Sequence, residues 1–202
     1  MKVKILIKKI IYWALAFLIA IGAALYQRMT GPTHPLNIKF PVGEEIYKIS
    51  VPRSHGEETD CPVEITLPEQ FAGEIVYRHF STNETWDTIQ LLRVNRNLLT
   101  LLPQQPPAGK LEYQVNLKAN GSAIDLGLDE SIVIRFMGSV PAWVLIPHVL
   151  FMFLAVFWSN ATGIQAAANI ESYRRNGLIT VILFAIGGLI LGPIVQKYAF
   201  GA

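Results

Sequence analysis

Three apolar stretches decide the fold: IIYWALAFLIAIGAALYQ at residues 10–27, a second within residues 136–170, and GLITVILFAIGGLILGPIVQ at residues 177–196. None of them contains Asp, Glu, Lys or Arg. An α-helix rises about 1.5 Å per residue, so roughly 20 apolar residues cross the hydrocarbon core of a bilayer. The sequence therefore predicts a multi-pass membrane protein with three transmembrane helices.

The charged residues indicate which segments face which side of the membrane. Basic residues flank the apolar stretches: Lys2, Lys4, Lys8 and Lys9 before the first, and Arg174 and Arg175 between the second and third. The block from residue 28 to residue 140 has ten basic and fourteen acidic residues, a net charge of −4. Positive flanks stay in the cytoplasm. We therefore expect a cytoplasmic N-terminus and a main domain on the outer side of the membrane.

The first apolar stretch is predicted to be a retained signal anchor. It starts after a basic segment, as a cleaved signal peptide would, but its apolar region is longer than the usual core of about 7–15 residues. The small residues Gly22, Ala23 and Ala24 are followed by Leu25 and Tyr26, with no polar cleavage region between them.

The apolar stretches divide the 202-residue chain into five segments. We expect a cytoplasmic stub and signal-anchor helix at 1–29, a periplasmic β-sandwich at 30–139 and a second transmembrane helix at 140–160. A cytoplasmic loop at 161–176 and a third helix with a short outer C-terminus at 177–202 follow. The fold class is a membrane protein of α + β type.

Short strands separated by turn residues are predicted throughout the outer block. They cover residues 36–40, 46–51, 63–67, 74–80, 88–94, 98–102, 111–118 and 131–137. In the strand at 111–118, Leu and other apolar residues alternate with polar ones, which predicts one buried face. Asn120-Gly121 is a hairpin signal, with residues 124–126 as the possible partner strand. This pattern predicts an all-β immunoglobulin-like sandwich.

One tyrosine adds detail to this prediction. The stretch LPQQPPAGKLEYQV, residues 102–115, is a Pro/Gly-rich corner leading into a strand that contains Tyr113. It resembles the E–F corner of immunoglobulin-like and fibronectin type III domains, where a tyrosine hydroxyl bonds to the backbone upstream. The resemblance implies that Tyr113 is a structural corner residue with a buried ring, and it implies a fold and no activity.

Four further stretches show a wider resemblance: TGPTHP at residues 30–35, LPQQPPAGKLEY at 102–113, RFMGSVPAWVLIPH at 135–148 and GPIVQKYAFG at 192–201. Together they are similar to a family of bacterial multi-pass inner-membrane proteins that have an immunoglobulin-like or fibronectin type III-like domain after the first helix. Members of this family continue into further helices after the last motif. The resemblance implies an architecture and brings no assigned chemistry.

His148 is the one imidazole inside a predicted span, directly after Pro147. Ionisable groups within membranes are rare and mark functional sites by default. Met152 lies four residues further on and therefore on the same helix face, so this pair is a candidate for binding haem iron or copper. The alternative is a neutral histidine that is hydrogen-bonded to a neighbouring helix or to water.

Other groups of polar residues are predicted to have structural roles only. The loop SHGEETDC contains His55, Glu57, Glu58, Asp60 and Cys61, but its spacing fits no metal motif, so we predict a solvated acidic loop and no metal site. Cys61 is the only cysteine and is expected to be a small hydrophobic residue, with an intermolecular bridge or a reactive thiol as the alternative.

Gly188 and Gly192 form a GxxxG pattern in the third stretch. Small residues at this spacing let helices approach closely, so these two glycines are predicted to form a helix-packing face. Pro193 is expected to kink or end the helix. Trp143 and Trp158 are expected to anchor the two ends of the second helix at the membrane interfaces.

No GxSxG, P-loop, HExxH or CxxCH motif is present, and no catalytic residue is predicted. We therefore expect a non-enzymatic accessory or scaffolding subunit of an inner-membrane complex. Its partners would be other membrane-protein subunits and the lipid bilayer, with no nucleic acid. The alternative is a redox or cofactor-holding membrane subunit with His148 as a haem or copper ligand.

Overall fold

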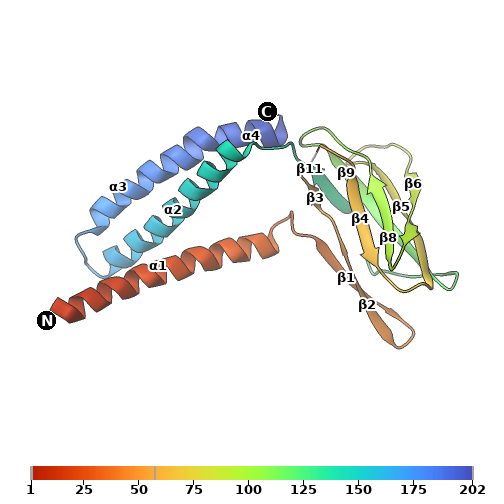
Figure 1. Ribbon diagram of the computed structural model, residues 1–202, viewed down its shortest axis with the longest axis horizontal. Helices are drawn as coiled ribbons and strands as arrows, with labels where there is room; N and C mark the ends of the chain where they lie inside the picture. The colour runs from red at the N-terminus through yellow and green to blue at the C-terminus, as the bar shows by residue number, and fades with distance from the viewer. Residues whose placement is uncertain (1, 57, 202) are drawn as a thin grey trace. The chain divides into compact units, whose positions relative to one another are not determined.

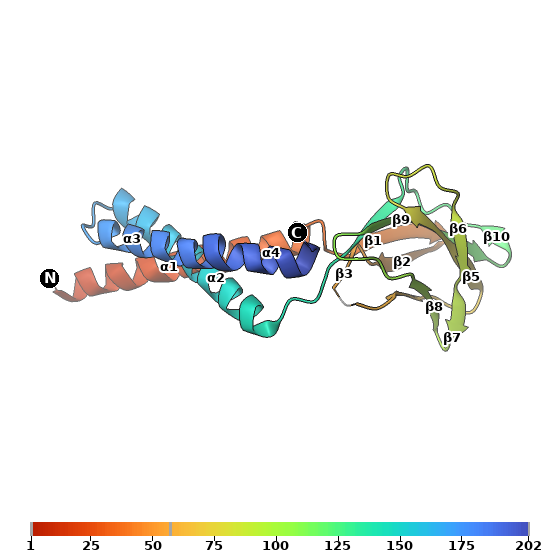
Figure 2. The same ribbon diagram turned by 90° about the horizontal axis from the view of Figure 1, so that it is seen from above.

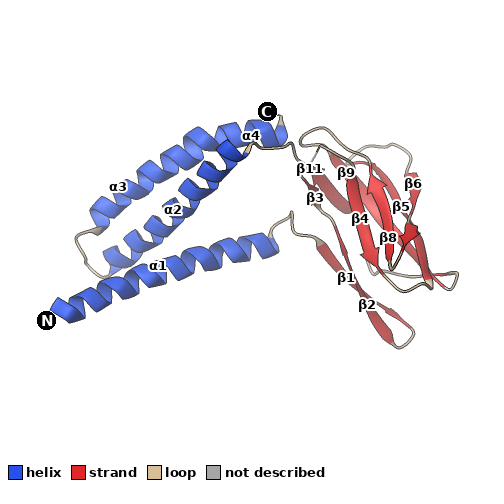
Figure 3. Cartoon of the chain, in the orientation of Figure 1, coloured by secondary structure: helices blue, strands red, loops and turns tan. Residues whose placement is uncertain are grey.

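The computed structural model describes residues 2–56 and 58–201, which form two compact units. One unit is helical and combines the chain up to Gly31 with the chain from Val140 onward; the other, Pro32–Ser139, is built from β-strands. Figure 1 follows the chain through both units, and Figure 3 separates their helices from their strands. The predicted α + β class is confirmed.

The described residues of the helical unit form three long apolar helices. They are α1 (Lys2–Thr30), α2 (Ala142–Ala167), and a third that consists of α3 (Tyr173–Phe184), the π-helical segment η1 (Ala185–Leu191) and α4 (Gly192–Phe200). Each is long and apolar enough to cross a membrane, at Ile7–Thr30, Ala142–Ala167 and Tyr173–Phe200. The chain is therefore consistent with a multi-pass membrane protein.

The second helix extends beyond its expected end at residue 160. α2 continues to Ala167 and α3 begins at Tyr173, so much of the expected loop at 161–176 is helical. Polar side chains such as Thr162 and Gln165 favour a loop in the sequence, but here they are satisfied within the helices. The Thr162 hydroxyl donates to the Trp158 carbonyl at 2.8 Å, and Gln165 accepts hydrogen bonds from Ser172 and Asn176.

Small and aromatic side chains form the contact between α1 and α2. Ala16 and Ala20, four residues apart, are buried on α1. The Trp13 ring lies 5.3 Å from that of Phe157 and 5.5 Å from that of Trp158, between ring centroids. Trp158 packs within this cluster, and its Nε1 is buried with no acceptor among the described residues.

Strands of the β unit pair into three sheets. The first joins β1 (Leu36–Val42) to β2 (Glu45–Val51). The second has the order β3 (Ser54–His55), β11 (Ile132–Phe136), β9 (Lys110–Ala119), β5 (Phe71–His79) and β6 (Asp87–Gln90), with β10 (Ser122–Ala123) also paired to β9. The third has the order β4 (Cys61–Thr66), β8 (Asn97–Leu102) and β7 (Leu92–Val94). All pairs are antiparallel except β3 with β11.

The chain changes sheets where the sequence predicts one continuous strand at residues 88–94. β6 pairs with β5, whereas β7 pairs with β8, and the two strands follow one another directly (Figure 2). Leu91 lies at the change and is buried, and its N–H donates to the Gly73 carbonyl at 2.9 Å. The prediction of a single strand at residues 88–94 is therefore wrong, because this segment contributes β6 to the second sheet and β7 to the third.

The hairpin signal at Asn120-Gly121 is confirmed. Both residues have positive φ angles, +50° and +84°, as a tight two-residue hairpin turn requires. The partner strand is β10, which pairs Ser122 with Ala119 and Ala123 with Lys118. It begins directly after the turn, and not at residues 124–126 as the sequence predicts.

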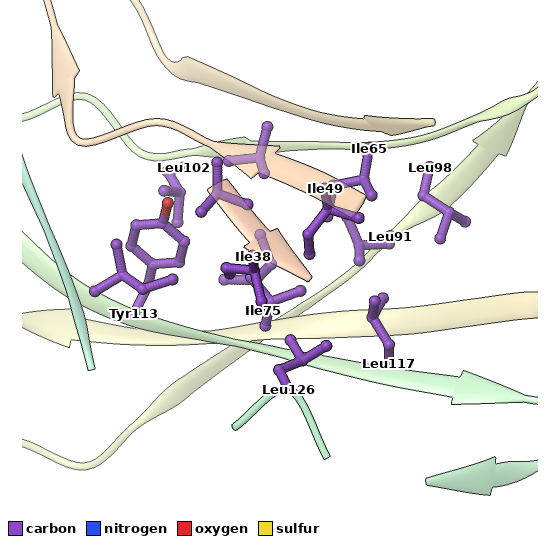
Figure 4. Close-up of a cluster of buried hydrophobic side chains, with 14 of the residues drawn as sticks. Ile38, Ile49, Ile65, Ile75, Leu91, Leu98, Leu102, Tyr113, Leu117 and Leu126 are labelled. Atoms are coloured by element: carbon purple, nitrogen blue, oxygen red, sulfur yellow. The ribbon is translucent and has the colours of Figure 1, made fainter. Parts of the chain in front are cut away.

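One hydrophobic core holds the β unit together. The predicted alternation is confirmed on β9, where Leu111, Tyr113, Val115 and Leu117 are all buried. Side chains from all three sheets meet them in a single cluster, including Ile38, Ile49, Ile65, Ile75, Leu98 and Leu102 (Figure 4). Burial of this apolar surface is the main source of the unit's stability.

Glu112 is a buried carboxylate between two core residues of β9, at 9% exposure. Its Oε2 accepts a hydrogen bond from the Ser131 hydroxyl at 2.8 Å, and its Oε1 accepts one from Arg78 Nε at 2.7 Å. The Ser131 hydrogen bond, together with Arg78, holds the pKa of this carboxyl below its usual range. Glu112 thereby links β9 to β5 and to the segment before β11.

Candidate functional site

His148 lies on α2 and is hydrogen-bonded to the third helix. Its Nδ1 is 2.9 Å from the carbonyl oxygen of Gly187 in η1. A carbonyl can only accept, so Nδ1 carries the hydrogen and Nε2 of the neutral ring is an acceptor. The expected hydrogen bond to a neighbouring helix is therefore present, and a ligand-binding nitrogen remains on the other side of the ring.

The π-helical segment explains how the third helix accommodates Pro193. Proline has no N–H and its ring clashes with the carbonyl four residues earlier in an α-helix. The wider turns of η1 precede Pro193, which then occupies the first turn of α4. Single π-helical turns are concentrated at functional sites. The helix continues past Pro193 to Phe200 and does not end there.

Gly187 is the glycine that brings the two helices together. A Cβ added to it would lie 2.9 Å from the Cβ of Phe151 and 3.2 Å from both the backbone N and Sδ of Met152. At Gly188 the three atoms nearest to an added Cβ would belong to the Phe184 ring of its own helix, at 3.4 Å or more. At Gly192 the nearest side-chain atom of α2 would be His148 Cε1, at 3.9 Å.

His148 and Met152 therefore contact the same part of the third helix. Histidine ligands usually donate their second ring nitrogen to a carbonyl or carboxylate, as His148 does to Gly187. Within residues 2–56 and 58–201, no group of three or more His, Cys, Asp or Glu side chains is placed to hold a metal ion. What the chain itself offers to haem or copper is one nitrogen and one thioether on a single helix face.

In the acidic loop SHGEETDC, His55 contacts Thr59 and Cys61 is buried in the hydrophobic core. His55 Nε2 lies 3.2 Å from the Thr59 hydroxyl, and Glu57 lies outside the described residues. Cys61 is buried in the hydrophobic core at 2% exposure, and burial raises the pKa of its thiol to about 11. A protonated, inaccessible thiol fits the expected hydrophobic role and not the alternative of a reactive cysteine.

Tyr113 connects distant segments of the β unit. Its side chain is fully buried, and its hydroxyl donates to the Pro52 carbonyl at 2.7 Å. Burial, as the largest cause, raises the pKa of this hydroxyl. The resemblance to a tyrosine corner implies a partner a few residues upstream, but Pro52 lies between β2 and β3. The hydrogen bond therefore joins β9 to the segment between β2 and β3.

An open apolar groove of about 460 Å³ lies where β6, β7 and β8 meet. Its lining consists of Ile89, Gln90, Leu92, Val94, Leu99, Thr100 and Leu101. Leu92 is 68% exposed, and Val94 and Leu101 are each 50% exposed. Soluble surfaces seldom expose contiguous apolar side chains without a function. We call this surface the β6–β7 groove.

Two open sheet edges border the β6–β7 groove. β6 is the last strand of the second sheet and β7 the last strand of the third. Between Leu92 and Val94, Arg93 donates hydrogen bonds to the carbonyls of Leu67 and Pro68, at 2.6 and 2.9 Å. The guanidinium is thus held by loop backbone, and the groove is lined by apolar side chains of β7.

No protein-family model, curated protein or solved structure matches this chain. What the chain does is therefore inferred from its own residues and contacts.

Proposed function

We propose that this chain is a non-enzymatic accessory or scaffolding subunit of a bacterial inner-membrane complex. In this function the three apolar helices anchor the chain, and the β unit presents the β6–β7 groove to another subunit. The exposure of Leu92, Val94 and Leu101 in one groove is the observation that supports the proposal. Covering apolar surface contributes roughly 25 cal/mol per Å² to association.

The groove suits an extended segment of a partner subunit. An edge strand offers unpaired backbone N–H and C=O groups, to which another strand can add. β6 and β7 both provide such edges, and the apolar lining between them suits alternate side chains of the incoming strand. The proposed partner is therefore another polypeptide with an apolar strand.

The immunoglobulin-like assignment of the β unit belongs to the same proposal. Its support is the strand order, in which β5, β9 and β11 are neighbours in one sheet and β4 and β8 in another. The core that all sheets share also favours a sandwich.

A periplasmic location of the β unit is proposed from the basic residues. Lys9 and Arg175 line one cavity, so the basic starts of the first and third spans lie at the same end of the helical unit. The positive-inside rule assigns that end to the cytoplasm. The β unit follows the other end of α1 and precedes the other end of α2. This connectivity supports a periplasmic location for it.

The double substitution Leu92→Glu and Leu101→Glu is expected to release partner subunits. Charges in the groove cannot be desolvated without a large cost when an apolar strand binds. The full chain, purified in mild detergent from its own host, should lose its co-purifying polypeptides at least tenfold relative to the unsubstituted chain.

Ile46→Glu is the matched control, because Ile46 is 76% exposed and does not line the groove. It should leave co-purification unchanged. Retention of all partners by the double variant, or equal losses in both variants, would show that the groove is not the binding surface.

A redox or cofactor-holding subunit is the second candidate. The hydrogen bond from His148 Nδ1 to Gly187 favours it, because it leaves Nε2 as a ligand nitrogen on the helix face that Met152 shares. Protein from its own host should then show a Soret band or stoichiometric copper that is absent from His148→Ala. A colourless, copper-free protein would exclude this function.

A further inference from the structure

A polar cavity lies at the end of the helical unit where the basic residues gather. It has a volume of about 210 Å³ and is bordered by α1, the last turns of α2 and the first turn of α3. At roughly 30 Å³ of liquid volume per water molecule, it has room for a group much larger than one water. Its residues belong to the helical unit alone, so it is separate from the β6–β7 groove.

Buried amides form the floor of this cavity. Gln165 and Asn176 both line it and are each 4% exposed. Gln165 Oε1 accepts hydrogen bonds from Asn176 Nδ2 and from the Ser172 hydroxyl, both at 2.7 Å. The Nε2 group of Gln165 donates no hydrogen bond to the described residues, although the side chain lines the cavity. It is therefore an N–H donor that is available to a ligand.

Two cations stand at the cavity wall. Lys9 and Arg175 both line it, and neither forms an ion pair with a carboxylate of the described residues. Among the described residues, no Asp or Glu lines the cavity. Tyr12 and Trp13, each with a hydrogen-bond donor, complete the wall. The cavity thus combines positive charge with several donors, which suits a negatively charged oxygen ligand.

The position of the cavity indicates where such a ligand resides. The apolar spans begin at Ile7 and at Tyr173, and the lining residues Lys9 and Ser172 lie close to these starts. This is the depth of lipid headgroups in a bilayer.

We propose that this cavity binds a phosphate group, and specifically the phosphate of an anionic phospholipid headgroup. Lys9 and Arg175 would neutralise its charge, and Gln165 Nε2 would donate a hydrogen bond to one of its oxygens. Free phosphate has the same chemistry and is the second source to be distinguished. The lipid would hold α1 against the α2–α3 pair at this end of the unit.

Thermal unfolding of the full chain in a neutral detergent tests the proposal. Three probes are titrated separately: phosphatidylglycerol, phosphatidylcholine and inorganic phosphate. The expected result is a saturable rise in Tm with phosphatidylglycerol and little rise with phosphatidylcholine. The double variant Lys9→Gln and Arg175→Gln should bind phosphatidylglycerol at least tenfold more weakly.

The matched control is Lys8→Gln with Arg174→Gln. These neighbours have the same charge but do not line the cavity, and Arg174 Nε bonds to the Tyr173 hydroxyl at 3.2 Å. The control should bind phosphatidylglycerol like the unsubstituted chain. Saturation by inorganic phosphate that needs Lys9 and Arg175 would support the phosphate site and identify its ligand as soluble. Equal weakening in both double variants, or no response to any probe, would overturn the proposal.

Discussion

Replacing Tyr113 with alanine is expected to lower the free energy of unfolding of the β unit by about 3–5 kcal/mol. The ring is fully buried in the shared core, so its removal leaves a cavity among side chains of several strands. The Pro52 carbonyl also loses its donor. Chemical denaturation of the isolated unit, Pro32–Ser139, would measure the loss.

Two further variants separate packing from hydrogen bonding at this position. Tyr113→Phe keeps the ring and removes only the hydroxyl, for an expected loss of about 1 kcal/mol. Phe80→Ala is the control for loss of an aromatic ring, since Phe80 is 40% exposed, and its effect should be much smaller. A Tyr113→Ala unit as stable as the Phe80→Ala unit would contradict the described core.

Replacing Gly187 with leucine is expected to separate α2 from η1 and destabilise the helical unit by about 1–3 kcal/mol. Even the first added carbon would lie 2.9 Å from Phe151 Cβ and 3.2 Å from the Met152 backbone nitrogen, and backbone cannot move aside cheaply. The His148 hydrogen bond to the same residue should break. Unfolding of the full chain in mixed detergent micelles would measure the effect.

Gly188→Leu provides the comparison, because the atoms nearest to a Cβ added there belong to the ring of Phe184 on its own helix, at 3.4 Å or more. Its effect on unfolding should be small. If Gly188→Leu destabilised the helical unit more than Gly187→Leu, the packing face would be the GxxxG pair that the sequence predicts.

The difference between Gly187 and Gly188 is not predictable from the GxxxG pattern. The GxxxG rule assumes α-helical spacing, under which Gly188 and Gly192 share a face. The π-helical segment before Pro193 changes that spacing, and Gly187 is the glycine that contacts α2. Packing of Gly188 and Gly192 against another helix stays a prediction. Proline predicts a disturbance of the helix, but not whether the helix bends, ends or widens.

Hydropathy alone is enough to predict the three long helices, because an uncharged stretch of about 20 apolar residues is typical of a membrane-spanning helix and rare elsewhere. Period-two alternation similarly locates β9 and most other strands. It cannot locate the change of sheet at Leu91, since alternation is the same on either side of the change. β3, with two residues, is too short to have any periodicity.

The two binding surfaces are hidden in the sequence for different reasons. Leu92 and Leu101 look like core residues in the sequence, and only the strand pairing shows that they lie on the outside. Gln165 and Asn176 lie in the segment that the sequence predicts to be a loop. In the structure they form a buried hydrogen bond between α2 and α3. His148 is identifiable because polar residues in an apolar stretch are rare.

The central position of β9 has a consequence for synthesis of the chain. β9 pairs with β5, β10 and β11. The second sheet therefore lacks its central strand until residues 110–119 have left the ribosome. Until then Phe71 cannot pair with Ala119, its partner on β9, and β5 is exposed without its neighbouring strand. Pairings this distant along the chain form slowly, and exposed edges favour aggregation in the interval. The edge of β5 in the newly made β unit is therefore exposed until β9 is available, at a stage when α1 is already complete.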